Sequence, residues 1–315
     1  MESLIPKIKI SLVVIGQNDL SSLRKIYSED YLREIGRHIG ELIYVDSASS
    51  DGSKELMQKL GFSVFVISKA ELCNASAGRH VGTSVARGEF VLFLDSDMKL
   101  ENPGSFFASI LRSITKNFVG VVCTVKDIYP NSSERIRLRK AKPDGTASSF
   151  GGGVLLHRTS IISVGNWNFR LAANEELDLQ VRIERSGGKI LFLPQPTILH
   201  FTRQPSRLHE LLNLYVPGRS VRYGSWGKLL AQQTDWQARA TIINRNREAP
   251  FLVLTLVILS INVFAGALAF VIYQLDLLSR RSVAYNVVVP GIALSMIIGL
   301  LLPRNHVLDI EYDAL

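Results

Sequence analysis

The first hundred residues alternate between short apolar runs and longer amphipathic segments. The short apolar runs predict strands at residues 7–15, 41–45, 63–66 and 90–94. The segments between them predict helices at residues 20–35, 53–60 and 74–86. Farther along, we expect strands near 118–125, 153–156 and 189–193 and a helix at 175–186. This alternation indicates an α/β fold with a mostly parallel sheet and helices on both faces.

Two long uncharged segments lie near the C-terminus, Phe251 to Tyr273 and Val283 to Leu302. Each is long enough to cross about 30 Å of hydrocarbon as a helix. They raise the mean hydropathy to +0.17. We therefore expect a transmembrane hairpin at residues 251–302 and a cytosolic tail at 303–315. Basic and aromatic residues are interleaved at 204–250, which favours helices lying in the membrane interface.

The N-terminal sequence, the net charge and the cysteines limit the cellular location and the binding partners that we expect for the protein. Residues 1–9 show no signal-peptide pattern, so we expect the N-terminal domain, residues 1–203, to face the cytosol from a membrane such as a bacterial inner membrane. The formal net charge of +8 suits anionic lipid and diphosphate, and no nucleic-acid-binding motif accompanies it. Two cysteines without metal-like spacing are consistent with a reducing compartment.

The strand predicted at 90–94 runs directly into Asp95-Ser96-Asp97. Ligands in open α/β sheets bind at the carboxyl ends of strands, so these side chains lie where a ligand is expected. Two carboxylates at this spacing can hold Mg²⁺ or Mn²⁺, which in turn neutralises a diphosphate. An isolated Asp-x-Asp is also common in a solvated turn, and the neighbouring motifs decide between the two interpretations.

Three further motifs accompany this pair. Residues 43–53 end a strand in Asp46 and continue through Asp51 into a helix-capping turn. The helix at 74–86 contains Ala77-Gly78-Arg79-His80-Val81-Gly82. Later segments contain Gly151-Gly152-Gly153 and the acidic helix Glu175-Glu176-Leu177-Asp178 with Arg182.

In order and separation, these motifs resemble those of the family 2 glycosyltransferases over about residues 8 to 203. The resemblance implies the GT-A fold and transfer of a sugar from a nucleoside-diphosphate sugar. Two positions depart from the family pattern: His80 stands where Asn is usual, and Glu176 where the catalytic Asp is usual.

The resemblance also implies roles for individual residues. Asp95 and Asp97, with His200, would hold Mg²⁺ or Mn²⁺, and Glu176 beside Glu175 would be the general base. The residues implied in substrate binding are Asp46, Asp51, Arg79, Ser96, Gly152, Gly153, Asp178 and Arg182. For several of these a plain structural role is equally open: Asp178 and Arg182 can form an ion pair, and His200 can be a surface histidine.

The expected protein is a membrane-anchored inverting glycosyltransferase with a lipid or lipid-linked acceptor. A polyprenyl-phosphate sugar synthase, a polysaccharide synthase and a non-catalytic nucleotide-sugar-binding subunit remain as alternatives. No Gly-x-Gly-x-x-Gly follows the first strand, which argues against a dinucleotide-binding oxidoreductase. The basic run from Arg135 to Lys142 is expected to be a mobile loop or a solvated charge run.

Overall fold

The computed structural model describes residues 9–69, 73–113, 118–130, 133–137, 141–202, 225–233, 236–245, 248–280, 290, 293 and 312–314. The chain divides into two compact units. The first comprises residues 1–170, 175–204 and 307–315, and the second comprises residues 171–174 and 205–306.

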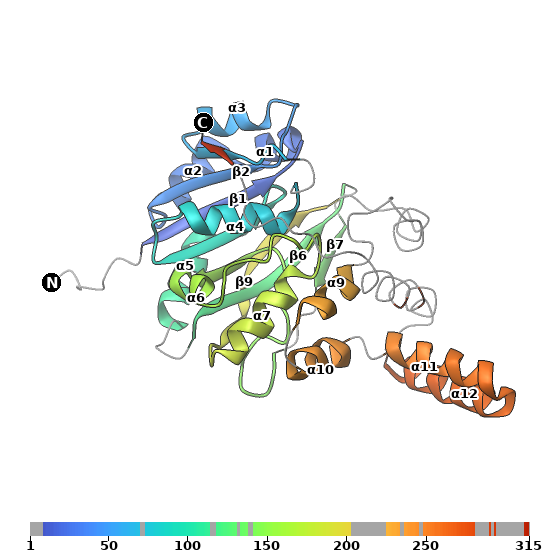
Figure 1. Cartoon of the computed structure of the whole chain (residues 1–315). Coiled ribbons are helices and arrows are strands. Elements are labelled where there is room, and N and C mark those ends of the chain that lie inside the picture. The colour runs from blue at the N-terminus through green and yellow to red at the C-terminus, as the bar shows by residue number, and fades with distance from the viewer. Residues whose placement is uncertain are drawn as a thin grey trace. The chain divides into compact units, whose positions relative to one another are not determined.

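The first unit is built on one sheet, flanked by helices (Figure 1). Its strand order is β10-β3-β2-β1-β4-β8-β6-β9-β5. Four neighbouring strands are parallel, as the sequence predicts: β3 (Ser63–Val66), β2 (Glu41–Asp46), β1 (Ile10–Gly16) and β4 (Phe90–Asp95). Their carboxyl ends therefore share one edge of the sheet. This edge carries Asp46 and Asp95.

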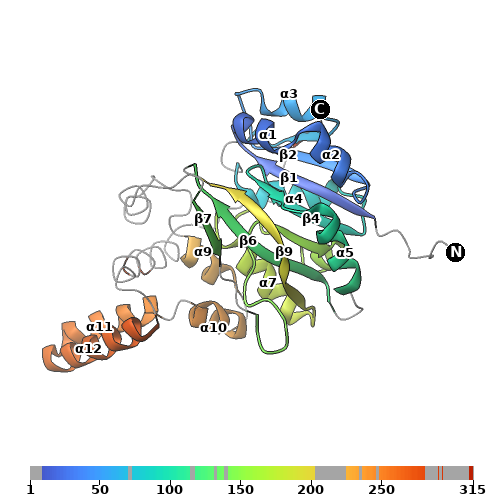
Figure 2. The same cartoon turned by 180° about the vertical axis from the view of Figure 1, so that it is seen from behind.

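The other half of the sheet is mixed, which corrects the expectation of a mostly parallel sheet. Strand β8 (Val154–His157) is antiparallel to both β4 and β6 (Gly120–Ile128). Strand β9 (Ile190–Phe201) is parallel to β6 and antiparallel to β5 (Met98–Leu100). Figure 2 shows β6 and β9 side by side from behind.

Helices cover both faces of the sheet because its strands are apolar on both sides. On one face, Leu12 and Val14 pack in a core with α1 (Leu20–Ile26), α2 (Glu29–Ile35), α3 (Ser53–Lys59) and α5 (Pro103–Ser113). On the other, Val13 and Ile15 pack with α4 (Ala75–Val85), α6 (Arg158–Ser163) and α7 (Glu175–Arg185). In α4, a Cβ on Gly82 would overlap the Val13 side chain, so glycine lets this helix lie close to β1.

Four local predictions need correction. The helix predicted at 20–35 is two helices, because the Ser28 side chain accepts a hydrogen bond from the Tyr31 amide and starts α2 as a new helix. Strand β9 extends to Phe201, well beyond the predicted residue 193. The predicted loop at 135–142 begins within strand β7 (Glu134–Arg137), which pairs with β6. In the predicted tail, β10 (Asp313–Ala314) pairs with β3.

The second unit is helical in its described parts. It contains α9 (Ser225–Gln232), α10 (Trp236–Arg245), α11 (Glu248–Ile261) and α12 (Val263–Arg280). The expectation of one long helix at 251–273 is wrong, because the helical run is interrupted at Asn262. The rings of Phe251 and Tyr273 lie 5.9 Å apart, so α11 and α12 fold back on each other as a hairpin.

Among the described residues, none of the helices meets the length and hydropathy needed to cross a membrane. The first of the two predicted spans is therefore not supported. The second, at 283–302, lies outside the described residues except for Pro290 and Ala293. Most of the predicted interface segment before α9, residues 203–224, also lies outside them.

Candidate active site

Asp46 ends β2 and is completely buried. Its Oδ2 accepts a hydrogen bond of 2.7 Å from the Ser49 amide, while no hydrogen-bond partner for its Oδ1 is found among the described residues. A buried carboxylate oxygen without a donor is costly, so this atom is suited to a donor supplied by a ligand.

The loops after β1 and β2 are held together by hydrogen bonds between their side chains and backbones. The Asn18 amide donates to Ser49 Oγ at 2.8 Å, and Asn18 Oδ1 accepts from the Ser50 amide at 2.9 Å. Asp51 accepts from the Leu20 amide and from Ser53, so its carboxylate joins the starts of α1 and α3. Against the effect of partial burial, these hydrogen bonds lower the pKa of Asp51.

The same loops reach the strand that carries the Asp-x-Asp pair. The Ser96 hydroxyl donates a short hydrogen bond to Asp19, which also accepts from the Gln17 amide. The Ser96 amide donates to the Ile15 carbonyl at 2.9 Å. Ser96 therefore holds the turn after β4 against the loop after β1.

Arg79 lies at the centre of the site and links it to the acidic helix. Its side chain is only 2% exposed. One guanidinium nitrogen donates to Asp95 Oδ1 at 2.8 Å, and the other donates to Glu175 Oε1 at 2.7 Å and lies 3.7 Å from Glu176 Oε1. The Trp167 ring lies 5.2 Å from the guanidinium carbon. Arg79 thus connects the end of β4 to the start of α7.

The two glutamates at the start of α7 differ in their surroundings. The Glu175 side chain is 6% exposed and bonded to Arg79, whereas the Glu176 side chain is 22% exposed and farther from it. Burial and the neighbouring charge of Glu175 raise the pKa of Glu176 to about 7, although Arg79 acts in the opposite direction. Burial alone would lower the pKa of Arg79, but Asp95, Glu176 and Glu175 raise it above its ordinary value.

Gly152 borders the same carboxylate, and Gly153 follows it in the chain. A Cβ on Gly152 would overlap Asp95 Oδ2, so only glycine fits beside the second oxygen of that carboxylate. Gly153 has a φ of +82° and lies against Ile198. Glycine at position 152 therefore lets this part of the backbone lie close to Asp95.

Asp97 lies next to His200 of β9. The distance from His200 Nε2 to Asp97 Oδ2 is 3.2 Å, and His200 Nδ1 lies 2.7 Å from Asp127 Oδ1. One carboxylate oxygen and one imidazole nitrogen at this separation form a donor pair that suits Mn²⁺. Within the described parts of the chain, however, three or more His, Cys, Asp or Glu side chains nowhere form a ready metal cluster.

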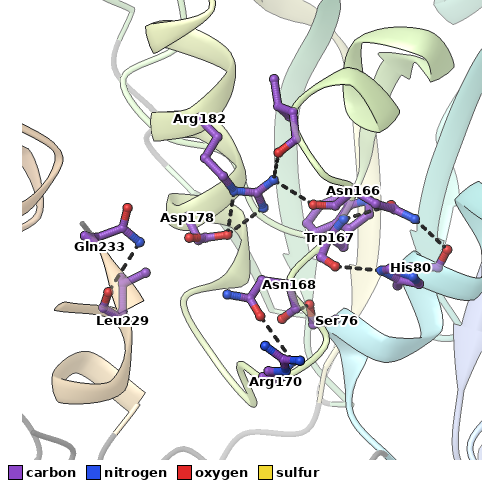
Figure 3. Close-up of polar contacts among 11 residues, drawn as sticks. Ser76, His80, Asn166, Trp167, Asn168, Arg170, Asp178, Arg182, Leu229 and Gln233 are labelled. Carbon is purple, nitrogen blue, oxygen red and sulfur yellow. Dashed lines mark hydrogen bonds and ion pairs between the residues drawn. The ribbon is translucent and has the colours of Figure 1, made fainter. Parts of the chain in front are cut away.

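Asp178 and Arg182 hold a loop in place, as Figure 3 shows. Arg182 donates to Asp178 Oδ2 through two nitrogens, at 2.9 and 2.5 Å, and to the carbonyls of Val164 and Asn166 at 2.6 and 2.7 Å. The following Trp167 carbonyl lies 2.7 Å from His80 Nδ1. This clamp places Trp167 against Arg79, which indicates a structural role. The proposed contact of Asp178 and Arg182 with substrate stays a prediction.

The structure thus brings most of the predicted residues into one region and gives some of them unexpected surroundings. Arg79 faces protein carboxylates, and its expected proximity to phosphate stays a prediction. Sequence reasoning missed Asp19 and Asp127. The signal for Asp19 was its place after the first strand, at the same sheet edge as Asp46. Asp127 could have been noticed as an acidic residue within a predominantly apolar strand.

Comparison with known proteins agrees with this arrangement. Residues 32–178 match the family model described as Glycosyl transferase family 2. This match supports a family 2 glycosyltransferase domain and covers Asp46, Arg79, Asp95, Asp97 and Glu176. His200 and Arg182 lie beyond it.

Individual relatives are distant. A segment of 104 residues is 29% identical to the cholesterol galactosyltransferase of Borreliella burgdorferi, covering 32% of this chain and 28% of that protein, so the match spans less than a third of either. A mannosyltransferase from Pyrobaculum calidifontis, solved with GDP-Man and Mn²⁺, has a TM-score of 0.55 and 13% identity, covering 93% of this chain and 87% of that chain. GalNAc-T7, solved with UDP, GalNAc and Mn²⁺, has a TM-score of 0.49 and 15% identity, covering 76% and 54%. The similarity to the mannosyltransferase supports the GT-A-like fold.

Proposed function

We propose that this protein is an inverting glycosyltransferase that moves a sugar from a nucleoside-diphosphate sugar to a lipid or lipid-linked acceptor at the cytosolic face of a membrane. The observation that carries the proposal is a series of polar contacts, linked at residues 18–19 and 95–96 by the backbone. It runs from Asp46 through the loops at Ser49 and Asn18 to Asp19 and Ser96, and from the adjacent Asp95 through Arg79 to the glutamates of α7. A donor-binding group and a candidate base are thereby held in one framework.

Asp46 is the proposed contact for the nucleoside. Its Oδ1 is buried at the carboxyl end of β2 and can accept a hydrogen bond from a base or ribose. Because none of the residues that the structure describes donates to this oxygen, a bound nucleoside that supplies a donor satisfies a group that is otherwise costly to bury. This contact favours donor binding and takes no part in the bond changes.

Asp97 and His200, with Asp95 nearby in sequence, are the proposed ligands of the metal. Mg²⁺ and Mn²⁺ are commonly held by one or two protein groups together with phosphate oxygens, which fits a site without three clustered protein ligands among the described residues. When bound, the cation supplies positive charge beside the departing diphosphate. Glycine at position 152 lets the backbone lie close to Asp95 Oδ2, where any side chain would overlap the carboxylate.

Glu176 is the proposed general base. It removes the proton from the acceptor hydroxyl, the acceptor oxygen forms a bond to the anomeric carbon, and the bond from that carbon to the diphosphate oxygen breaks. Attack from the face opposite the leaving group inverts the anomeric configuration. A pKa of about 7 suits this role, because a base is most effective when its pKa lies near the operating pH. Glu175, bonded to Arg79, is the proposed anchor beside it.

Two observations support a lipid acceptor. The similar Borreliella protein is named for transfer of galactose to cholesterol. In the second unit, the α11–α12 hairpin exposes large apolar side chains on both helices, among them Leu254, Ile261 and Leu268. An exposed apolar surface of this kind is suited to contact with lipid. Membrane attachment through this hairpin is part of the proposal.

The test is transfer by the purified full-length protein in detergent. UDP- and GDP-sugars are offered with Mn²⁺ and a membrane-lipid extract that contains sterol, and products are identified by mass spectrometry. We expect a glycosylated lipid, with Asp97→Asn reducing its formation by about 10²-fold or more, as for loss of an electrostatic catalytic group. Asp30→Asn, on an exposed carboxylate of α2, is the matched control.

The outcomes separate the alternatives. A polyprenyl-phosphate sugar and a polymer have distinct masses, so the same experiment recognises a synthase of either kind. Full activity in EDTA would remove the metal from the proposal. Nucleotide-sugar binding without transfer to any acceptor would instead favour a non-catalytic subunit.

A further inference from the structure

Asp127 is a buried acid inside a strand, and its contacts point toward the proposed metal site. Its Oδ1 lies 2.7 Å from His200 Nδ1. The other nitrogen of the same ring, Nε2, lies 3.2 Å from Asp97 Oδ2. The imidazole is therefore held between two carboxylates, one of which belongs to the Asp-x-Asp pair.

The sheet places Asp127 and His200 on neighbouring strands, and Asp97 lies in the turn just before β5. His200 of β9 is in register with Asp127 of β6 on one side and with Met98 of β5 on the other. The Phe201 amide also donates to the Asp97 carbonyl at 2.8 Å. The backbone thus sets the spacing of Asp97, His200 and Asp127, and residues in register on adjacent strands project from the same face.

We propose that Asp127 is a positioning residue that prepares His200 to bind the divalent cation, an inference that rests on the proposed function. Its carboxylate accepts the Nδ1–H of the imidazole, which fixes the tautomer and directs the Nε2 lone pair toward Asp97. His200 and Asp97 would then hold the cation, His200 through its Nε2. Partners that orient a ligating histidine in this way commonly change metal affinity by about 10- to 100-fold.

The competing explanation is that Asp127 only ties β6 to β9. The two strands are already in parallel register from Thr124 to Ile128, with backbone pairing at each position. The neighbouring residue Lys126 forms ion pairs with Glu101 and Glu134. Lys126→Met is therefore a matched control for the loss of a side-chain link in the same strand.

The experiment measures binding of Mn²⁺ alone to the full-length protein by electron paramagnetic resonance. We expect Asp127→Ala to weaken Mn²⁺ binding by about 10- to 100-fold. Asp127→Asn keeps a hydrogen-bond acceptor for Nδ1–H without the charge, so its loss should be smaller. Lys126→Met should bind Mn²⁺ as the wild type does. Thermal unfolding of each variant is recorded in parallel.

A second readout identifies the ligand directly. Spin-echo modulation of bound Mn²⁺ should show a coupled imidazole nitrogen in the wild type, and His200→Gln should abolish it. Unchanged Mn²⁺ affinity in Asp127→Ala, with or without a lower unfolding temperature, would mean that Asp127 is only a structural link.

The failure of this inference can be told from the failure of its premise. If Asp97→Asn and His200→Gln weaken Mn²⁺ binding while Asp127→Ala does not, only the positioning role is wrong. If none of the three variants matters, the proposed metal ligands are wrong and the inference falls with them. The transfer assay with the donor panel reports on the glycosyltransferase activity separately from both.

Discussion

Replacing Glu176 with glutamine should stabilise the protein while removing its proposed activity. The pKa of Glu176 is raised from 4.5 to about 7, so the folded state keeps a proton that the unfolded chain loses between these two values. Wild-type stability therefore falls as the pH rises through this window, and the penalty is complete above about pH 7. The amide of the Glu176→Gln variant carries no charge at any pH and avoids the penalty.

The size of the effect follows from the shift. At about pH 8 the raised pKa of Glu176 lowers the free energy of unfolding by about 3 kcal/mol. At about pH 5.5 the same shift lowers it by about 1 kcal/mol. The stability advantage of Glu176→Gln should thus grow by about 2 kcal/mol between these pH values. For a domain of this size, that difference corresponds to about 4–8 °C in the midpoint of thermal unfolding.

The assay is thermal and urea unfolding of both proteins across this pH range. Glu55→Gln gives the background effect of the same change on α3, where the carboxylate is 62% exposed. Sugar transfer should fall by about 10²-fold or more in Glu176→Gln, because a general base is lost. If the stability difference between Glu176→Gln and the wild type stays constant with pH, the environment assigned to Glu176 is wrong.

Four further results are expected. The kcat/KM of transfer should rise with pH around an apparent pKa near 7, since Glu176 must be ionised to accept a proton. A rise around the ordinary glutamate pKa would contradict the raised pKa that burial gives Glu176. Gly152→Ala should reduce transfer by about 10-fold or more because its Cβ overlaps Asp95, whereas Gly104→Ala, which meets only one atom at 3.7 Å, should not. Arg79→Lys should lower the free energy of unfolding in urea by about 3 kcal/mol and remove most transfer, because an ammonium lacks the planar guanidinium that reaches both Asp95 and Glu175. Wild-type stability and transfer in this variant would show that Arg79 does not link the two carboxylates. Leu254→Asp and Leu268→Asp should each lower binding to lipid vesicles about 10-fold in a flotation assay, and Ile162→Asp of α6 is the control. Equal flotation of all three variants would mean that the α11–α12 hairpin does not bind the membrane.

The parallel half of the sheet could be predicted because its information is local. Strands β2, β3 and β4 are short apolar runs bounded by polar turns, and their bounds agree with the prediction to within one residue. In the other half, the path of β9 depends on pairing with residues about 70 positions earlier. Pro194, Gln195 and Pro196 interrupt its apolar pattern, which explains why only its first residues were predicted.

The same distinction applies to the site and to the predicted spans. Asp46, Asp95 and Asp97 follow strands, so their position at one sheet edge is readable from local patterns. The burial of Arg79 depends on Trp167 and Glu175, which come from distant segments, and no local pattern reports it. Hydropathy likewise measures how apolar residues 251–273 are, but it does not report the interruption at Asn262.

The charge balance around Arg79 explains why the least tightly bonded carboxylate is the candidate base. One guanidinium faces Asp95, Glu175 and Glu176, so the cluster contains more negative than positive charge when all three acids are ionised. Asp95 and Glu175 lie within 2.8 Å of a guanidinium nitrogen, while Glu176 lies at 3.7 Å. The excess charge is relieved most easily by a proton on Glu176, since that protonation sacrifices the weakest ion pair. The basicity of Glu176 is therefore set by the shared arginine and the neighbouring glutamate, which supports the proposal that Glu176 is the base.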